Sequence, residues 1–287
     1  MTRETAPDLR LRLYRMRESL RQSLRAMRST PHADPIFVLG TQKSGTSAIA
    51  GLLGIATGLR ATIDLQRDLA SPLAPMVARG ERSFRRFVRH HAEAFANPIV
   101  KDPNLTFLLP HLLERWPDAR IVFVRRDPVQ TVRSVLDRLG IPGDLASIDE
   151  ASIEAVPPGW RSVLDSRWCE RSSPGGEPDR PRLHYVEELA RRCLLSDRIC
   201  DRAIAERAGR TIELRYESFR RSKAASIEAL AERLGLEVRD AEALREAVDR
   251  PFQPAGRAAA VEPEVFFGAN LARLRRVAGL EGSERPR

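Results

Sequence analysis

The chain lacks the features of membrane proteins and of disulfide-bonded secreted proteins. It has no apolar run of about 18 residues, so we expect no membrane-spanning helix, and its N-terminus has no signal-peptide apolar core. Three cysteines, Cys169, Cys193 and Cys200, do not form a disulfide framework. Cys193 and Cys200 lie seven residues apart on a predicted helix, and we expect both to face the core. These absences favour a reducing, cytoplasmic setting.

Lysine is rare in this chain, whereas arginine is abundant. The formal net charge of +9 is compatible with nucleic acid, a membrane surface or an anionic substrate as partner. Lys43, Lys101 and Lys223 are the only lysines, and arginine is spread along the whole sequence with few aromatics. Because nucleic-acid binding needs basic residues clustered with aromatics, we expect no nucleic-acid partner. Each lysine is an informative position, and two of them fall in the motifs described below.

The length of 287 residues fits one large α/β domain or two small ones. We divide the chain into an N-terminal helix and linker (1–34), an α/β domain (35–250) with a loop-rich insertion (141–183), and a C-terminal tail (251–287). Within 8–29, leucine and methionine recur at helical spacing. This amphipathic helix is expected to dock on the domain, on a partner subunit of a homodimer, or on a membrane surface.

Short apolar segments alternate with helical patterns across the predicted domain. We expect strands within 35–40, 59–65, 98–104, 119–128 and 209–219, with helices between them. Such alternation predicts a parallel β-sheet flanked by helices, an α/β fold of the P-loop NTPase-like class. In sheets of this kind ligands bind beyond the carboxyl ends of the strands, so candidate site residues are sought there.

The segment "FVLGTQKSGTSAIAGLLG" (37–54) reads as a strand, a glycine loop and a helix. It has the two glycines of the phosphate loop GxxxxGK[ST], but Thr46 stands where the lysine belongs. The backbone N–H groups and the helix N-terminus still suit an anion, and Lys43 would stand near the start of a 5′-phosphate chain. The residues predicted to bind the ligand are Thr41, Gln42, Lys43, Ser44, Gly45, Thr46 and Ser47.

A second motif, "IVFVRRDPVQTVRSVL" (121–136), is a buried strand, a pair of arginines and a helix start. Asp127 is a good N-cap and Pro128 a good first helical residue. Arg126 is thereby held at the carboxyl end of the strand, with Ser134 two turns into the helix. An arginine and a hydroxyl there can clamp a second, separate phosphate.

Together the two motifs resemble the sulfotransferases that use 3′-phosphoadenosine 5′-phosphosulfate (PAPS). "GTQKSGTSAI" looks like their 5′-phosphosulfate loop and "FVRRDPVQTVRSVL" like their 3′-phosphate motif. "VKDPNLTFLLPHL" and "RYESF" are similar to two further segments of these enzymes, in the same order, and the resemblance spans 35 to about 236.

The resemblance implies metal-independent transfer of a sulfuryl group from PAPS, with adenosine 3′,5′-bisphosphate as the other product. It also implies that Lys43 contacts the oxygen bridging phosphate and sulfate. A cation there stabilises the transition state more than the ground state, because negative charge grows on that oxygen as the sulfuryl group leaves.

Lys101 and a set of acidic residues are the other catalytic candidates. Lys101, at a strand's carboxyl edge, is placed to touch the transferring sulfuryl group or hold the acceptor, and Asp102 is expected to cap the following turn. The acceptor hydroxyl or amine needs a general base. Asp64, at the end of the second strand, is our first candidate, and the alternatives are Asp68, His91, Glu81 and Glu93.

The acceptor itself is not readable from the sequence, and a carbohydrate, a lipid or a natural product all remain open. Trp160 and Trp168 in the insertion either line an aromatic acceptor pocket or anchor that loop to the core. The alternative enzyme is a P-loop kinase or NTPase, which needs Mg²⁺ and a lysine where Thr46 stands. A basic nucleic-acid-binding protein is the alternative from another class.

Overall fold

The computed structural model describes residues 29–70, 72–170, 180–252 and 261–280. The amphipathic helix expected at 8–29 lies outside these ranges except for its last residue, so it stays a prediction. In the described part of the chain, no helix combines the length and the apolar character needed to cross a bilayer.

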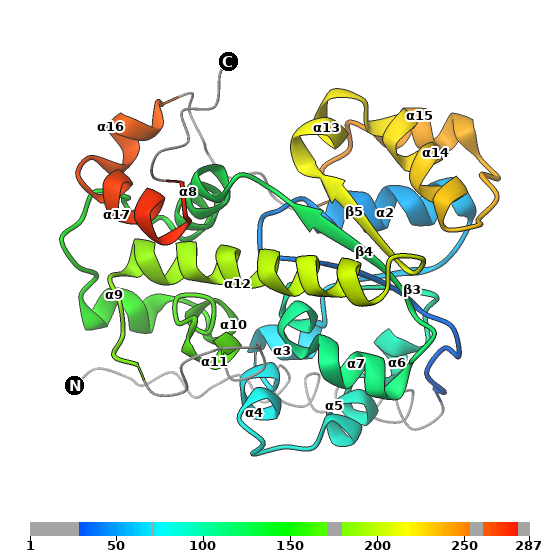
Figure 1. Ribbon diagram of the computed structural model, residues 1–287, viewed down its shortest axis with the longest axis horizontal. Coiled ribbons are helices and arrows are strands. Elements are labelled where there is room, and N and C mark those ends of the chain that lie inside the picture. Colours follow the sequence, from blue (N-terminus) through cyan, green and yellow to red (C-terminus); the bar gives the residue numbers. More distant parts are fainter. Residues whose placement is uncertain (1–28, 71, 171–179, 253–260, 281–287) are drawn as a thin grey trace, which may run out of the picture.

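The core of the fold is a five-stranded parallel sheet in the order β2-β3-β1-β4-β5. The strands are β1 (Ile36–Gly40), β2 (Ala61–Ile63), β3 (Ile99–Lys101), β4 (Arg120–Arg125) and β5 (Thr211–Arg215). In the central strand, Ile36 lies opposite Ile99 on one side and Arg120 on the other. The predicted α/β class, a parallel sheet flanked by helices, is confirmed (Figure 1).

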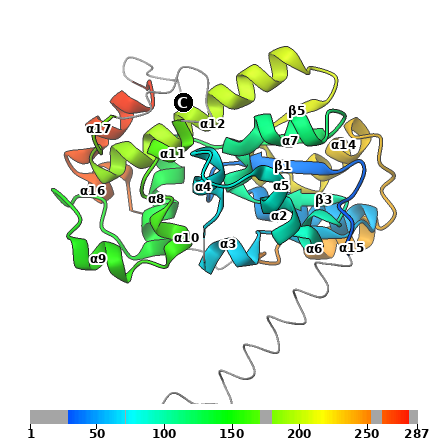
Figure 2. The same ribbon diagram turned by 90° about the horizontal axis from the view of Figure 1, so that it is seen from below.

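Helices cover both faces of the sheet (Figures 1 and 2). Every residue of the central strand β1 is therefore buried, as is usual for a parallel sheet. Ile36 and Val38 pack into a core shared with α2 (Thr46–Thr57), α14 (Lys223–Arg233) and α15 (Ala241–Ala247). Phe37 and Leu39 point to the opposite core, which contains residues of α4 (Ala74–Ala78), α5 (Phe84–His90), α6 (Ala92–Phe95), α7 (Leu109–Arg115) and α12 (Tyr185–Glu206). Alternate residues thus serve opposite layers.

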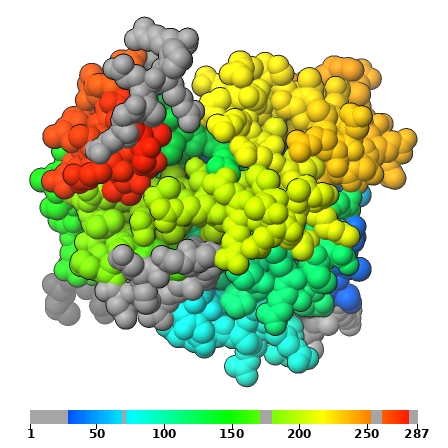
Figure 3. Space-filling model, viewed as in Figure 1, coloured from blue at the N-terminus to red at the C-terminus, as the bar shows by residue number. Residues whose placement is uncertain are grey.

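A third core lies beside the sheet, around α8 (Pro128–Leu139) and the first half of α12. The C-terminal tail contributes to it through α16 (Pro263–Phe267) and α17 (Asn270–Val277), in which Phe267, Leu271 and Leu274 are buried. Figure 3 shows α12 crossing the molecule between these tail helices and the segment from β5 to α14. The sequence did not predict the tail helices.

The insertion 141–183 carries three short helices, α9 (Glu150–Ala155), α10 (Pro158–Arg161) and α11 (Arg167–Glu170). Its C-terminal end is held to α12 by Arg180, whose guanidinium lies 2.8 Å from both Glu170 and Glu188. Both carboxylates are fully buried, so this end of the insertion is firmly attached to the domain.

Several local expectations differ in detail from the structure. The region between the second and third expected strands holds several short helices, with α5 and α6 meeting at His91, and the strand expected within 209–219 ends at Arg215, where α13 (Tyr216–Arg221) begins. Pro110 is accommodated in the first turn of α7, after the 3₁₀ helix η1 (Pro103–Leu108), because a first-turn residue needs no intrahelical N–H bond. Cys193 and Cys200 are buried, as expected.

Candidate functional site

The carboxyl ends of all five strands meet at one cavity of about 610 Å³. The loop after β1 supplies Gln42, Lys43 and the first residues of α2. The other strands supply Asp64 after β2, Lys101 at the end of β3, Arg126 after β4 and Tyr216 after β5. The parallel topology therefore gathers residues as far apart in the sequence as Gln42 and Tyr216 around one space.

All three lysines of the chain line this cavity. Lys43 and Lys101 come from the predicted motifs. Lys223, at the start of α14, donates to the carbonyl of Val248 at 2.8 Å and to Asp249 Oδ1 at 2.9 Å. Lys223 was not predicted to be a site residue, although the rarity of lysine in this chain makes each lysine position informative.

The glycine loop is held in an uncommon backbone conformation. Lys43 has φ +66° and Asp64 has φ +63°, and among the described residues they are the non-glycine residues with positive φ. Such a conformation costs about 1–3 kcal/mol and persists where the surrounding structure enforces it. Here Ser44 Oγ donates to the carbonyl of Thr41 at 2.7 Å, and Thr106 Oγ1 bridges the N–H and carbonyl of Gly40.

The predicted loop residues divide into two groups by where their side chains lie. Gln42, Lys43, Gly45, Thr46 and Ser47 line the cavity. Thr41 and Ser44 are buried, and their side chains are not part of the described lining. Thr41 and Ser44 therefore shape the loop with their side chains and offer a ligand only their backbone.

Gly45 is required by the close approach of Tyr216. A Cβ built on Gly45 would stand 2.3 Å from Tyr216 Cδ2, and the φ of +98° also disfavours other residues. The Tyr216 ring in turn carries Arg126, whose guanidinium carbon lies 4.4 Å from the ring centroid. Arg126 also donates from Nη1 to the carbonyl of Lys43 at 2.5 Å. The two phosphate motifs are thus in direct contact.

Arg126, Ser134 and Arg138 form one basic wall of the cavity. Asp127 caps α8, as predicted, by accepting from Gln130 N at 2.9 Å, and the helix places Ser134 and Arg138 one turn apart. Burial first, and then the charges of Arg138, Arg126 and Lys101, lower the pKa of Lys43 below its ordinary value of 10.5. An anionic ligand would relieve this crowding of positive charge.

Asp64 and Lys101 form an ion pair, with Asp64 Oδ1 2.5 Å from Lys101 Nζ. Lys101 is almost completely buried, with a side-chain exposure of 2%, and Asp64 has 13%. The strand register aligns them, because Ile63 lies opposite Lys101 and Asp64 N donates to the Lys101 carbonyl at 2.8 Å. The structure therefore places the predicted catalytic lysine and the first candidate base side by side.

The alternative bases are placed unequally. Asp68 on α3 (Gln66–Ala70) lines the cavity and is buried, with His91 behind it: His91 Nε2 lies 3.6 Å from Asp68 Oδ1. Glu81 is exposed and pairs with Arg79, and Glu93 is exposed on α6. Of the five candidates, only Asp64 and Asp68 are among the described residues that line the cavity.

Asp102 caps the turn after β3, as predicted, and is fully enclosed. Its Oδ1 accepts from Asn104 N at 2.8 Å and its Oδ2 from Leu65 N at 3.0 Å. Burial, followed by the charges of Asp64 and Asp68, raises the pKa of Asp102 to about 7, and the Leu65 amide acts in the opposite direction. Asp102 thus joins the starts of η1 and α3 beneath the site.

Arg192 of α12 lies beneath the glycine loop and was not anticipated from the sequence. Its Nε donates to Gln42 Oε1 at 2.9 Å, its Nη2 to Asn104 Oδ1 at 2.8 Å and its Nη1 to Cys169 Sγ at 2.8 Å. The side chain is buried, and among the described residues no carboxylate lies within ion-pair distance of it. A buried cation therefore supports the glycine loop from below.

The two tryptophans of the insertion have different surroundings. Trp168 is buried, donates from Nε1 to the Ser162 carbonyl at 2.8 Å, and packs edge-on against Phe107. Trp160 is half-buried and lines the cavity. Trp168 therefore anchors the insertion to the core, whereas Trp160 is available to a ligand.

Comparison with family models agrees, over part of the chain, with the resemblance that the motifs indicated. A family model described as "Sulfotransferase family" matches residues 55–154. The matched segment includes Asp64, Lys101, Arg126 and Ser134, and it begins after the glycine loop. A search of curated proteins finds no match to the chain.

Solved structures with a similar fold are also sulfotransferases. Sulfotransferase STF9 from Mycobacterium avium aligns with a TM-score of 0.51 and 12% identity, covering 92% of this chain and 79% of that one. STF1 from Mycobacterium tuberculosis H37Rv aligns with a TM-score of 0.49 and 13% identity, covering 91% and 80%. Mouse SULT7A1, crystallised with PAP, gives a TM-score of 0.44, 13% identity and coverage of 77% and 66%. The alignment with STF9 shows that this chain has the fold of that sulfotransferase.

Proposed function

We propose that the protein transfers a sulfuryl group from PAPS to a hydroxyl or amine of an acceptor and releases adenosine 3′,5′-bisphosphate. The observation that carries this proposal is that one cavity is lined by both phosphate motifs, with Lys43 and Thr46 from the first and Arg126 and Ser134 from the second. A nucleotide that carries phosphate groups at two separate positions matches two separate anion sites.

The donor would be held from both ends of the cavity. The first N–H groups of α2, which have no partner within the helix, and the hydroxyls of Thr46 and Ser47 would bind the 5′-phosphosulfate. Arg126 and Ser134 would bind the 3′-phosphate. Tyr216, Phe219 and Phe252 line the same cavity and offer apolar surface to the adenine.

During transfer the bond between sulfur and the 5′-phosphate oxygen breaks, and a bond forms between sulfur and the acceptor oxygen or nitrogen. Lys43 would neutralise the charge that remains on the phosphate oxygen, and Lys101 would contact the group in transfer. The acceptor's proton would pass to a carboxylate, with Asp64 as the first candidate and Asp68 as the alternative that the cavity lining supports.

The chemical class of the acceptor stays open among carbohydrates, lipids and natural products. We also propose that residues 8–29 form a helix that docks on a second subunit or on a membrane surface. A P-loop kinase is the second candidate, because the loop and the helix after it also suit ATP phosphates. Thr46 weighs against it, since no lysine follows the second glycine.

A thermal-shift titration without metal tests the donor. Adenosine 3′,5′-bisphosphate should stabilise the protein at tenfold to hundredfold lower concentration than ADP, because a charge-assisted contact to the 3′-phosphate contributes about 1.5–3 kcal/mol. Arg126→Ala should erase this preference, so that adenosine 3′,5′-bisphosphate binds no more tightly than ADP does. Incubation with PAPS and a panel of acceptors, read by mass for the gain of one sulfuryl group, then tests transfer.

Arg215→Ala is the matched control for Arg126→Ala. Arg215 is the last residue of β5 and directly precedes Tyr216, whose ring contacts Arg126. Its side chain is 58% exposed, and it is not among the described residues that line the cavity. It should keep the nucleotide preference of the wild type. If Mg²⁺-ATP stabilises the protein better than adenosine 3′,5′-bisphosphate does, the sulfotransferase proposal is wrong and the kinase takes its place.

A further inference from the structure

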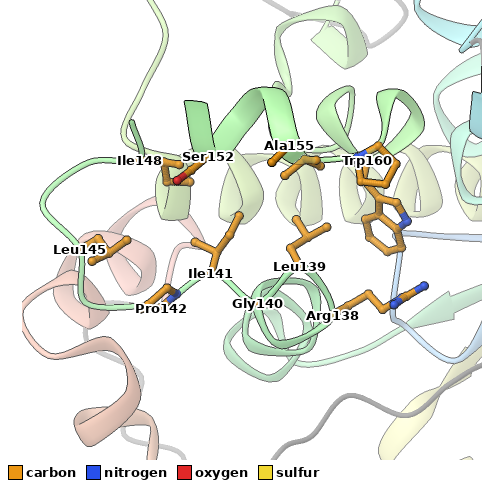
Figure 4. Close-up of a pocket in the computed structure, with 12 residues that line it drawn as sticks. Arg138, Leu139, Gly140, Ile141, Pro142, Leu145, Ile148, Ser152, Ala155 and Trp160 are labelled. Atoms are coloured by element: carbon orange, nitrogen blue, oxygen red, sulfur yellow. The ribbon is translucent and has the colours of Figure 1, made fainter. Parts of the chain in front are cut away.

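A second cavity, of about 360 Å³, adjoins the nucleotide cavity. It lies between the C-terminal end of α8 and the segment that carries α9 and α10 (Figure 4). Arg138 and Trp160 line both cavities, and Figure 4 shows these two side chains at the same end of the smaller one. The two cavities therefore meet at Arg138 and Trp160, and we refer to the smaller one as the side pocket.

Most of the side chains that line the side pocket are apolar, although polar atoms also reach its surface. Leu139 and Ile141 rise from the end of α8 towards α9 (Figure 4). Ser152 is the one polar side chain in the described lining besides Arg138 at the junction. The remaining lining residues are Gly140, Pro142, Leu145, Ile148, Ala155, Val156, Pro157 and Trp160. The volume lies within the range of small-molecule sites, which are mostly apolar with a few polar groups.

Helix α9 forms the roof of the side pocket without filling it. A packed amphipathic helix buries one face, yet α9 has no buried residue. Its N-terminus is fixed by Asp149, which accepts from Ser152 N at 2.8 Å. Its C-terminus is fixed by Arg161, which donates to the carbonyls of Val156 and Glu154 at 2.7 and 2.9 Å. These contacts fix the two ends of α9 locally, and the flanking residues Ile148 and Val156 pack into the third core, so the helix stands over apolar side chains that a ligand could cover.

We propose that the side pocket binds the apolar body of the acceptor, an alcohol or phenol whose reactive hydroxyl lies in the main cavity beside Lys43 and Lys101. The identity of the occupant as an acceptor rests on the function proposed above. The donor nucleotide does not suit this pocket, because its phosphates need the cations of the main cavity. An uncharged hydrocarbon or aryl group does suit it, because away from Arg138 the lining carries no charge.

The test is a series of 4-alkylphenols with ethyl to hexyl chains, titrated into the full-length protein saturated with adenosine 3′,5′-bisphosphate. Affinity should rise about threefold to fourfold for each added methylene until the pocket is full, as burial of apolar surface predicts. Ala155→Phe, which places a ring into the pocket from an exposed position on α9, should abolish this dependence on chain length. Glu154→Phe adds the same ring to the same helix outside the lining and should behave as the wild type.

Binding and transfer are read separately in this experiment, so the two proposals can fail independently. A wild-type affinity that does not change along the series, or a dependence that Ala155→Phe leaves intact, overturns the side pocket as a binding site. If affinity depends on chain length and Ala155→Phe abolishes this dependence, the side pocket is supported as a binding site. The absence of a sulfated phenol after incubation with PAPS would then count against the transfer reaction alone.

Discussion

Lys101 Nζ and Asp64 Oδ1 lie 2.5 Å apart at the ends of two neighbouring parallel strands. The strand register and the positive φ of Asp64 hold the pair together, so neither side chain is free to choose another position. The two charges therefore act as one unit at the floor of the cavity, and changing one partner alters the orientation of the other.

Asp64→Asn should lower turnover about 10²–10⁴-fold, the usual contribution of a general base, and leave the affinity for adenosine 3′,5′-bisphosphate unchanged. Turnover and nucleotide affinity should be measured on the same preparations. Asp68→Asn is the comparison, because Asp68 lines the same cavity. If Asp64→Asn turns over as the wild type does and Asp68→Asn does not, Asp68 is the base.

Lys43→Ala should reduce turnover about 10²–10³-fold with the fold intact, because it removes the cation that faces the leaving phosphate. The wild type should also lose activity in alkali. Lys43 acts as a cation and its pKa is lowered, chiefly by burial and by Arg138, so kcat/KM for PAPS should fall as pH rises through a value below 10.5.

Lys43→Arg separates this explanation from general alkaline damage. Arginine stays protonated throughout the accessible range, so the alkaline loss should move to higher pH even if the rate is lower. An unchanged alkaline limb in Lys43→Arg would show that another group titrates there.

Arg192→Met should destabilise the protein and weaken nucleotide binding. It leaves Gln42 Oε1 without its donor from α12 and deprives Asn104 of another, and a buried acceptor left unsatisfied costs about 1–3 kcal/mol. Urea unfolding and nucleotide titration measure the two effects. Arg198→Met, an exposed arginine on the same helix, is the control and should change neither. If Arg192→Met binds nucleotide as tightly as the wild type does, Arg192 does not support the glycine loop.

Asp102 should make stability depend on pH. Its folded pKa of about 7 lies above that of an unfolded aspartate, so the folded state holds a proton that the unfolded state releases. Stability should therefore fall as pH rises from about 4 to 7, by at most about 1.4 kcal/mol per pH unit, and level off above 7. Asp102→Asn should lack this contribution. The free energy of unfolding of the wild type and of Asp102→Asn should be measured with urea from about pH 5 to 8. A difference between the two proteins that stays constant over this range would contradict the prediction.

The elements that local sequence determines were predicted well. The strand before the glycine loop, the Asp127 cap and the position of Arg126 each depend on neighbouring residues, and the structure agrees with all of them. The contact between Arg192 and Gln42 could not be predicted in this way, because 150 positions separate the two residues. Nothing in the local pattern of α12 distinguishes Arg192 from the other arginines of the helix.

The side pocket was hidden for a different reason. The insertion was expected to be loop-rich because Pro and Gly punctuate it, and that composition does not reveal the short helices α9 and α10. Trp160 and Trp168 looked equivalent in the sequence. Their tertiary contacts, such as the packing of Phe107 against Trp168, separate the anchoring side chain from the one that faces the cavity.

The confinement of all three lysines to one cavity has a chemical consequence. In most proteins, amine-selective reagents modify many surface positions at once, but here every side-chain amine lies in the candidate site. Lys101 is paired with Asp64 and Lys223 with Asp249, whereas the lowered pKa of Lys43 gives it a larger neutral fraction than an ordinary lysine. Among the side-chain amines, mild acylation is therefore directed to Lys43, and a covalent probe could be delivered there without prior mutagenesis. For the same reason, attachment to an amine-reactive support through a lysine would block the site instead of presenting it.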